Sequence, residues 1–296
     1  RVTDGRSYTG LETTFTNIGF LGLGDLGITV NKLEVDYNAT SVTGGARLNW
    51  SAITTTSVGL LSSDQIRVGG NLEFNIQNFV KAAGDFAIAQ QTDLSFDDDD
   101  DANNGNEFTG DLLSINLSNV HLFVGSGAGD FNYDSEGLLT GIKDVNGTSV
   151  TEANTTATGF SVSGASVNIA IIKNTTTTTN QSWTGVAASI GSMTVVGIDT
   201  SVFDFEVKSL DLLYNGAATD GNKLDWDNLT DDGIVTGFEG LVNTLDIRVT
   251  GEAIIDISGF VQIRGSFGVS SSDNMDVTLS GGNITKTVSV FTIGFK

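Results

Sequence analysis

The sequence predicts an all-β protein, and three observations lead to this class. Apolar and polar residues alternate strictly over long stretches, above all at 245–269, as in half-buried strands. The chain has no proline, a residue that sheets confine to edges and turns. The sequence also repeats itself at a nearly fixed spacing. We expect an elongated β-solenoid or β-roll, or a strongly curved sheet of long strands, with tandem β-sandwiches as the alternative.

The stretch 245–269 reads LDIRVTGEAIIDISGFVQIRGSFGV, and its odd positions from 247 onward are apolar or glycine. It is about four times longer than an ordinary strand and shows no obvious turn. A straight strand of this length would span about 80 Å. Glycine within a strand marks a bend or a bulge, so we predict that the stretch bends at Gly251, Gly259 and Gly265.

The repeat gives this stretch a twin at 66–88, with the same phase of alternation. Upstream, the phrases SYTGL, ITVNKLEVDYNA and RLNW recur as SWTGV, FEVKSLDLLYNGA and KLDW. Downstream, LSINLS at 113–118 is echoed by FTIGFK at 291–296. The spacing is roughly 178 residues, which predicts a first repeat unit at 1–178 and a truncated second unit at 179–296. A piece of a longer tandem array and a self-contained duplicated protein both remain open.

The other expected elements follow from composition and punctuation. Valine, isoleucine, threonine and phenylalanine dominate four further strands, at 112–124, 159–172, 186–196 and 202–214. Glycine, asparagine, aspartate and threonine cluster in the intervening loops, at 97–107, 125–137, 144–158, 174–181 and 215–222. No window has convincing helical spacing, and no apolar run reaches the 18 residues that a membrane helix needs.

Composition narrows the function classes. The net charge of −22 argues against a nucleic-acid partner. The absence of cysteine excludes disulfides and thiolate metal sites, and the single histidine, His121, excludes a zinc site with two histidine ligands. We expect His121 to lie in a strand, and we expect no enzyme, because no nucleophile elbow is present. The first residues are neither a signal peptide nor an initial Met, which predicts a processed chain or part of a longer one.

Three acid-rich loops are the candidate metal sites. Calcium prefers six to eight oxygen ligands from flexible loops, which alternating Asp and Asn supply. The candidate ligands are Asp97, Asp99 and Asp101 in the first loop, Asp130, Asn132, Asp134 and Glu136 in the second, and Asp225, Asp227 and Asp231 in the third. The second loop departs from the EF-hand pattern, with Ser135 in place of the turn glycine. The acids are not kept between the two units, so solvated loops that keep the protein soluble are the alternative to calcium.

The phrases TGFSVSGASVNIAIIK, WTGVAASIGSMTVVGI, NKLDWDNL and ISGFVQIRGSFGV resemble units of giant, repetitive bacterial surface proteins. These adhesin-like chains are described as LEPR-XLL-type or hemolysin-type calcium-binding proteins. The resemblance covers most of the chain and implies an extracellular location at the cell surface, a tandem array and a calcium-dependent structural or adhesive role. The nonapeptide Gly/Asp calcium repeat of some such proteins is absent, so β-roll calcium sites are not carried over.

The preferred functional expectation is a structural repeat module of an extracellular filament or giant surface protein. Such a module would self-associate by strand stacking, stabilised by calcium, with no membrane span. The second hypothesis is an adhesin that binds a glycan or a cell surface through the loops at 97–107 and 215–233. The third is a β-helical polysaccharide-active enzyme.

Overall fold

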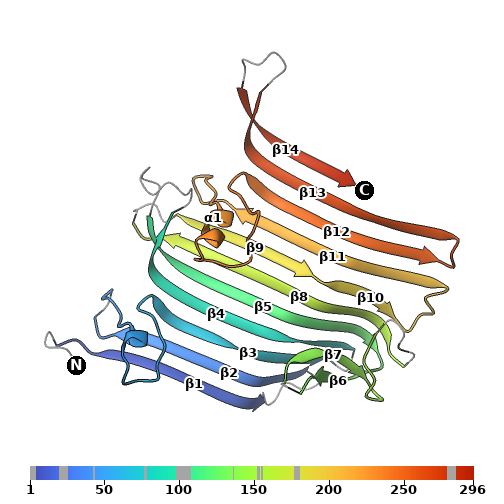
Figure 1. Ribbon diagram of the computed structural model, residues 1–296, viewed down its shortest axis with the longest axis horizontal. Helices are drawn as coiled ribbons and strands as arrows, with labels where there is room; N and C mark the ends of the chain where they lie inside the picture. Colours follow the sequence, from blue (N-terminus) through green and yellow to red (C-terminus); the bar gives the residue numbers. More distant parts are fainter. Residues whose placement is uncertain are drawn as a thin grey trace.

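The computed structural model describes residues 5–19, 26–42, 44–76, 79–97, 108–135, 137–151, 154, 156–176, 181–278 and 285–296 (Figure 1). The strands are β1 (Tyr8–Gly19), β2 (Leu26–Thr40), β3 (Asp64–Ile76), β4 (Val80–Phe96), β5 (Phe108–Ser126), β6 (Ala128–Tyr133), β7 (Leu139–Asp144), β8 (Thr158–Asn174), β9 (Ser182–Ile190), β10 (Ser192–Val196), β11 (Phe203–Gly216), β12 (Leu245–Ile257), β13 (Val261–Thr278) and β14 (Thr285–Phe295). The described helices are the 3-10 turn η1 (Trp50–Ala52) and the short α1 (Trp226–Asp231). The predicted all-β class is confirmed.

The strands form one large antiparallel sheet in which the chain runs back and forth. Its order is β1-β2-β3-β4-β5-β8-β10-β11-β12-β13-β14, and β9 lies in line with β10 between β8 and β11. Strands β6 and β7 form a separate two-stranded sheet. The long-stranded sheet is therefore confirmed, whereas the described strands form neither a solenoid nor tandem sandwiches. Alternation alone could not distinguish these folds, because strands alternate in the same way in a solenoid and in an antiparallel meander.

The overlong stretch at 245–269 is a hairpin of β12 and β13. Ile257 and Val261 face each other, and the loop between them has φ of 52° at Ser258 and 68° at Gly259. Because this loop spans three residues, both strands keep their apolar side chains at odd positions, and the alternation continues through the turn without a break. The predicted bend at Gly259 is thus a full reversal of the chain.

At Gly251, where a bend was predicted, β12 lies opposite a bulge in β11. Strand β11 has an irregularity between Val207 and Ser209, and a Cβ on Gly251 would lie 2.9 Å from the Ser209 carbonyl oxygen. Gly265 instead faces Ala253 in regular pairing. Of the three predicted bends, one is a turn, one accommodates a bulge and one lies in a regular ladder.

The two faces of the sheet differ in chemistry. Residues that face each other across a ladder share a face, so a row can be followed through all strands. One row consists of Phe15, Leu33, Gly70, Phe86, Leu117, Val167, Ala188, Leu212, Val249, Val269 and Ile293. The row one residue away on the other face consists of Thr14, Glu34, Gly69, Ala87, Asn116, Asn168, Ala187, Leu213, Arg248, Ser270 and Thr292. We call these sides the apolar face and the polar face.

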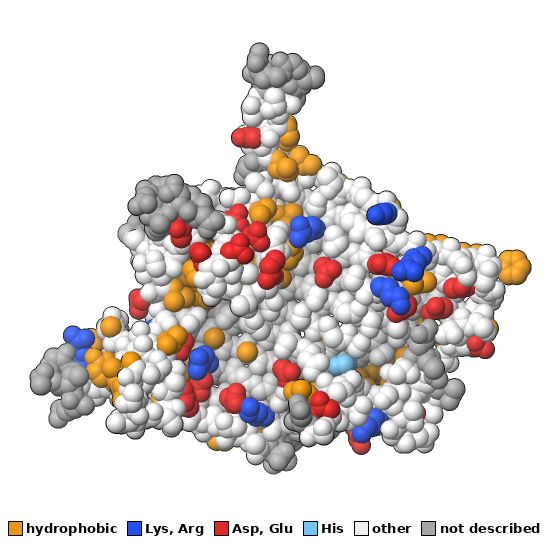
Figure 2. All heavy atoms as spheres, in the orientation of Figure 1, with side chains coloured by type: hydrophobic (Ala, Val, Ile, Leu, Met, Phe, Trp, Pro, Cys, Tyr) orange, Lys and Arg blue, Asp and Glu red, His pale blue; other side chains and the backbone are white. Residues whose placement is uncertain are grey.

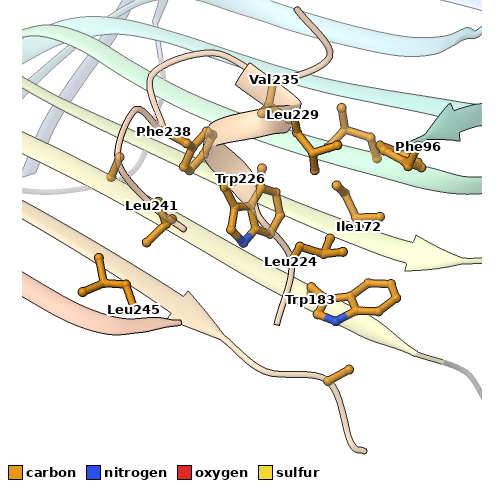
Figure 3. Packing of buried hydrophobic residues seen from close by; sticks show 14 residues of the cluster. Phe96, Ile172, Trp183, Leu224, Trp226, Leu229, Val235, Phe238, Leu241 and Leu245 are labelled. Atoms are coloured by element: carbon orange, nitrogen blue, oxygen red, sulfur yellow. The ribbon is translucent and has the colours of Figure 1, made fainter. Parts of the chain in front are cut away.

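Three described excursions of the chain cover parts of the polar face, which is the side seen in Figure 2. They are the segment with η1 between β2 and β3, the β6–β7 hairpin, and the segment with α1 between β11 and β12. The larger buried cluster lies beneath α1 and includes Trp226, Phe96 and Ile172 (Figure 3). A smaller one around Phe123 lies beneath the β6–β7 hairpin. The dense core is therefore on the face whose strand residues are the more polar.

His121 lies in β5, as predicted, and is buried. Its Nε2 lies 3.2 Å from Asn119 Oδ1, and the Asn119 amide in turn donates to the Leu139 carbonyl. Burial lowers the pKa of the imidazole below its usual value, because desolvation disfavours the charged ring.

We expect this histidine to make the fold less stable in acid. As the pH falls below about 6.5, the unfolded chain takes up the proton first, so stability present at neutral pH is lost toward the lower folded-state pKa. Urea midpoints at pH 7.5 and 5.5 for wild type and His121→Gln measure the effect. The wild type should lose more stability than the variant over this interval, and an equal loss would contradict the assignment.

Candidate interaction edges

A tryptophan from the α1 segment fixes that segment to the sheet. The Trp226 ring lies flat over Gly185, where a Cβ would come within 2.8 Å of the indole. Trp226 Nε1 donates to Asn215 Oδ1 at 3.0 Å, and the Asn215 amide donates to the carbonyls of Leu224 and Val242 at 2.9 and 3.1 Å. Trp226 is fully buried and Asn215 is 2% exposed. We call Gly185, Asn215 and Trp226 the second tryptophan clamp.

The first unit contains the same arrangement. Trp50 lies over Gly10, with 2.6 Å between its ring and a Cβ built there, and donates from Nε1 to Asn38 Oδ1 at 3.0 Å. The Asn38 amide donates to the carbonyls of Leu48 and Leu61. Gly10, Asn38 and Trp50 are the first tryptophan clamp. The sequence signal for both clamps was the recurrence of the TG, YN and LxW phrases. That these three phrases form one contact could not be recognised from the sequence.

The strand registers repeat as well. Strand β2 has a bulge between Val30 and Lys32 opposite Gly70, as β11 has one opposite Gly251. In the first unit, β5 follows β4 in the sheet, and Leu117 of β5 faces Phe86 of β4. The equivalent place in the second unit is held by strand β14. The unit boundary near residue 178 stays a prediction, because residues 177–180 lie outside the described part of the chain.

The place of β14 is set by its pairing with β13. Phe295 faces Phe267, just as Leu117 faces Phe86, and the two pairs correspond in the repeat. In the first unit, the side of β5 that faces away from β4 pairs with β8, and Ile115 lies opposite Ile169. On the described part of β14, that same side has no strand partner. The edge of β14 is therefore equivalent to an edge that β8 fills inside the sheet.

The opposite edge of the sheet, formed by β1, also corresponds to an edge that pairs with β8 inside the sheet. Leu11 of β1 faces Tyr37, and Val186 of β9 faces Tyr214, which are equivalent pairs. The other side of β9 is again occupied by β8, where Val186 faces Ile169. Among the described strands, β1 pairs with β2 alone. Both outer edges thus match surfaces that β8 bridges in the middle of the sheet.

The predicted calcium ligands are distributed over separate turns. Asp134 accepts a hydrogen bond from the Leu138 N–H at 2.9 Å, and Asp227 accepts one from the Gly240 N–H at 2.5 Å. Asp225 caps α1 by accepting from Asn228 at 3.3 Å, and burial raises the pKa of its carboxyl. Each of these carboxylates accepts from a backbone N–H, within its own turn for Asp134 and Asp225 and 13 residues along the chain for Asp227.

The remaining described candidates lie in three different elements or beside them. Asp130 and Asn132 lie in β6, Asp97 directly follows β4, and Asp231 ends α1. Asp99, Asp101 and Glu136 lie outside the described residues. Within the described ranges, no group of three or more His, Cys, Asp or Glu side chains is arranged to hold a metal ion. Calcium binding stays a prediction.

The loop predicted at 215–233 is largely a packing element. It contributes Ala218, Leu224 and Trp226 to the larger core beneath α1. Tyr37 and Tyr214 are 42% and 44% exposed on the apolar face. Glycan recognition at this loop has no described aromatic platform to support it and stays a prediction.

In the described part of the chain, no helix is long and apolar enough to cross a membrane. No family model, no curated protein and no solved structure matches this chain.

Proposed function

We propose that the chain is a structural repeat module, in which successive units extend one continuous β-sheet by pairing strands at their edges. The observation that carries the proposal concerns the two outer edges of the sheet. The β14 edge corresponds to the edge of β5 that pairs with β8, and the β1 edge corresponds to the edge of β9 that pairs with β8. The extracellular surface location, the array and the calcium dependence belong to the same proposal and rest on the resemblance to giant surface proteins.

Backbone pairing gives such a sheet its stiffness. Every strand added to an edge satisfies a row of exposed N–H and C=O groups that otherwise face water. The side chains of the added strand set the register, because a slip of one residue would place its apolar side chains on the polar face. A strand with the pattern of β8 meets both requirements.

The internal repeat supplies the register in advance. Ile115 faces Ile169, and Ile293 holds the place of Ile115. We therefore expect Ile293 of the β14 edge to face the Ile169 position of a β8-type strand. At the other edge, Leu11 should face that same position, because Leu11 holds the place of Val186.

A synthetic peptide of residues 158–174 tests this register. The chain has no cysteine, so one thiol can be introduced at Ile293 and one at the Ile169 position of the peptide. A short bismaleimide should join the two with a yield at least about tenfold above that for a peptide of scrambled sequence, since facing side chains lie about 5 Å apart. Mass spectrometry of the conjugate measures the yield.

Two controls make the result specific. Phe260→Cys is highly exposed on the turn between β12 and β13 and should react with the linker without preferring the native peptide. Leu11→Cys should prefer it, because the β1 edge has the same partner. Equal yields with the native and scrambled peptides at both edges would contradict sheet extension by β8-type strands.

A further inference from the structure

The apolar face is exposed at both edges and in the middle of the sheet. Phe15 is 49% exposed, Leu117 40% and Ile293 57%, although they lie at the two ends and the middle of one row. The three excursions that cover the sheet contact the polar face, and no described segment lies over the rows of the apolar face. Monomeric soluble proteins seldom expose a continuous apolar patch larger than a few hundred Å².

The size of this face fits a protein interface. Eleven strand positions at about 4.8 Å and roughly ten shared residues at 3.3 Å give an apolar area of about 1,700 Å². Two copies joined face to face would bury about 3,400 Å², which lies within the 2,000–5,000 Å² range of obligate homodimers. The face also has a hollow of about 130 Å³ over Gly84, lined by Leu72, Phe86 and Leu117, into which a side chain of a facing sheet can fit.

The charge distribution favours contact between two copies through their apolar faces over contact through their polar faces. The chain carries a net charge of −22, so contacts between polar faces would bring like charges together. The row from Phe15 to Ile293 contains no charged residue, whereas the ion pairs Lys32–Glu34 and Arg264–Glu252 lie on the polar face. Sheets packed about 10 Å apart through their apolar faces would hold the two sets of carboxylates well beyond the screening length of about 8 Å.

The sheet edges argue against hydrocarbon as the cover. In a single copy whose edges are not extended, the described strands β1 and β14 each present a row of backbone groups without a strand partner. Lipid chains cannot satisfy such groups, and each one left unpaired in hydrocarbon costs several kcal/mol. In a pair of stacked sheets the same edges remain at the water boundary.

From these observations we propose that two copies of this chain pack with their apolar faces together, as the two layers of an intermolecular β-sandwich. The proposal does not depend on sheet extension at the edges, because it uses side chains of one face and not the backbone of the outer strands.

Neighbouring residues on opposite faces provide a matched test. Ile88 and Leu117 are 38% and 40% exposed on the apolar face, and Ala87 and Ser118 are exposed beside them on the polar face. Sedimentation equilibrium of the full chain should give twice the 30.9 kDa of one copy for the wild type and for Ala87→Lys/Ser118→Lys. For Ile88→Lys/Leu117→Lys, dimerisation should weaken by about 100-fold or more, because the contact would bury unpaired charges. Lysine lowers the net negative charge, so repulsion between copies cannot explain the loss.

A milder pair of variants covers the case in which the lysine variant fails to fold. Ile88→Cys should cross-link to a second copy with a bismaleimide, whereas Ala87→Cys, one residue away on the polar face, should not. A monomeric wild type, or an unchanged dimer in the apolar-face lysine variant, would overturn the proposal. A wild type that is monomeric and floats with phosphatidylcholine vesicles would also overturn it and assign the face to lipid.

Discussion

Replacing Trp226 with alanine should lower the free energy of unfolding by about 3–5 kcal/mol, the usual loss for a large aromatic side chain removed from a core. Trp226 is fully buried, packs against the tilted ring of Phe238 at 5.4 Å between ring centroids, and belongs to the cluster beneath α1 (Figure 3). The cavity cannot collapse easily, because the sheet below it is held by backbone pairing on both sides of Gly185. Urea unfolding followed by circular dichroism measures the change.

The first clamp provides the matched control. Trp50 makes the same hydrogen bond and the same contact with a strand glycine, but it is half-buried and belongs to neither of the two core clusters. Trp50→Ala should therefore cost clearly less than Trp226→Ala. Equal losses would show that the stacking on glycine and the hydrogen bond, rather than the surrounding cluster, determine the contribution of the ring.

Replacing Asn215 with leucine should cost about 3 kcal/mol or more. The change leaves three buried groups without their partner, the Trp226 indole N–H and the carbonyls of Leu224 and Val242, at about 1–3 kcal/mol for each group that water cannot reach. Asn38 is equally buried and holds the equivalent groups of the first clamp. Its partners Trp50 and Leu61 are more exposed than Trp226 and Leu224, so Asn38→Leu should cost less than Asn215→Leu, in the same order as the two tryptophans. The same urea titrations measure both losses.

A double-mutant cycle separates the indole from the carbonyls. Trp226→Phe removes the N–H and keeps an aromatic ring, so the loss from Asn215→Leu should be smaller in that background by about 1 kcal/mol. Strict additivity would mean that the bond from the indole to Asn215 contributes nothing to stability, and the clamp would have to be described by packing alone.

The all-β class and most of the long strands could be read from the sequence, because alternation depends on residues near one another in the chain, whereas the loop predicted at 125–137 contains β6 and the strand predicted at 186–196 is divided between β9 and β10. Alternation assigns each strand two faces, and the phrases around Gly10, Asn38 and Trp50 recur around their counterparts. The hairpin turn at Ser258 was missed for an equally local reason, since a loop of three residues leaves the alternation unchanged. The sequence did not show that backbone donors of the same turn engage some of the acids, as at Asp134, and calcium binding stays a prediction.

The chain by itself therefore determined that one side of every long strand is apolar and that two units follow the same plan. Only the tertiary structure decided that all described strands except β6 and β7 lie in one sheet and that its three described covers lie on the polar face. It also decided that β1 and β14 end this sheet at edges that correspond to those of β9 and β5 beside β8. The physical reason is that alternation specifies which side chains share a face, whereas the connections and the long-range pairing decide what, if anything, lies against that face.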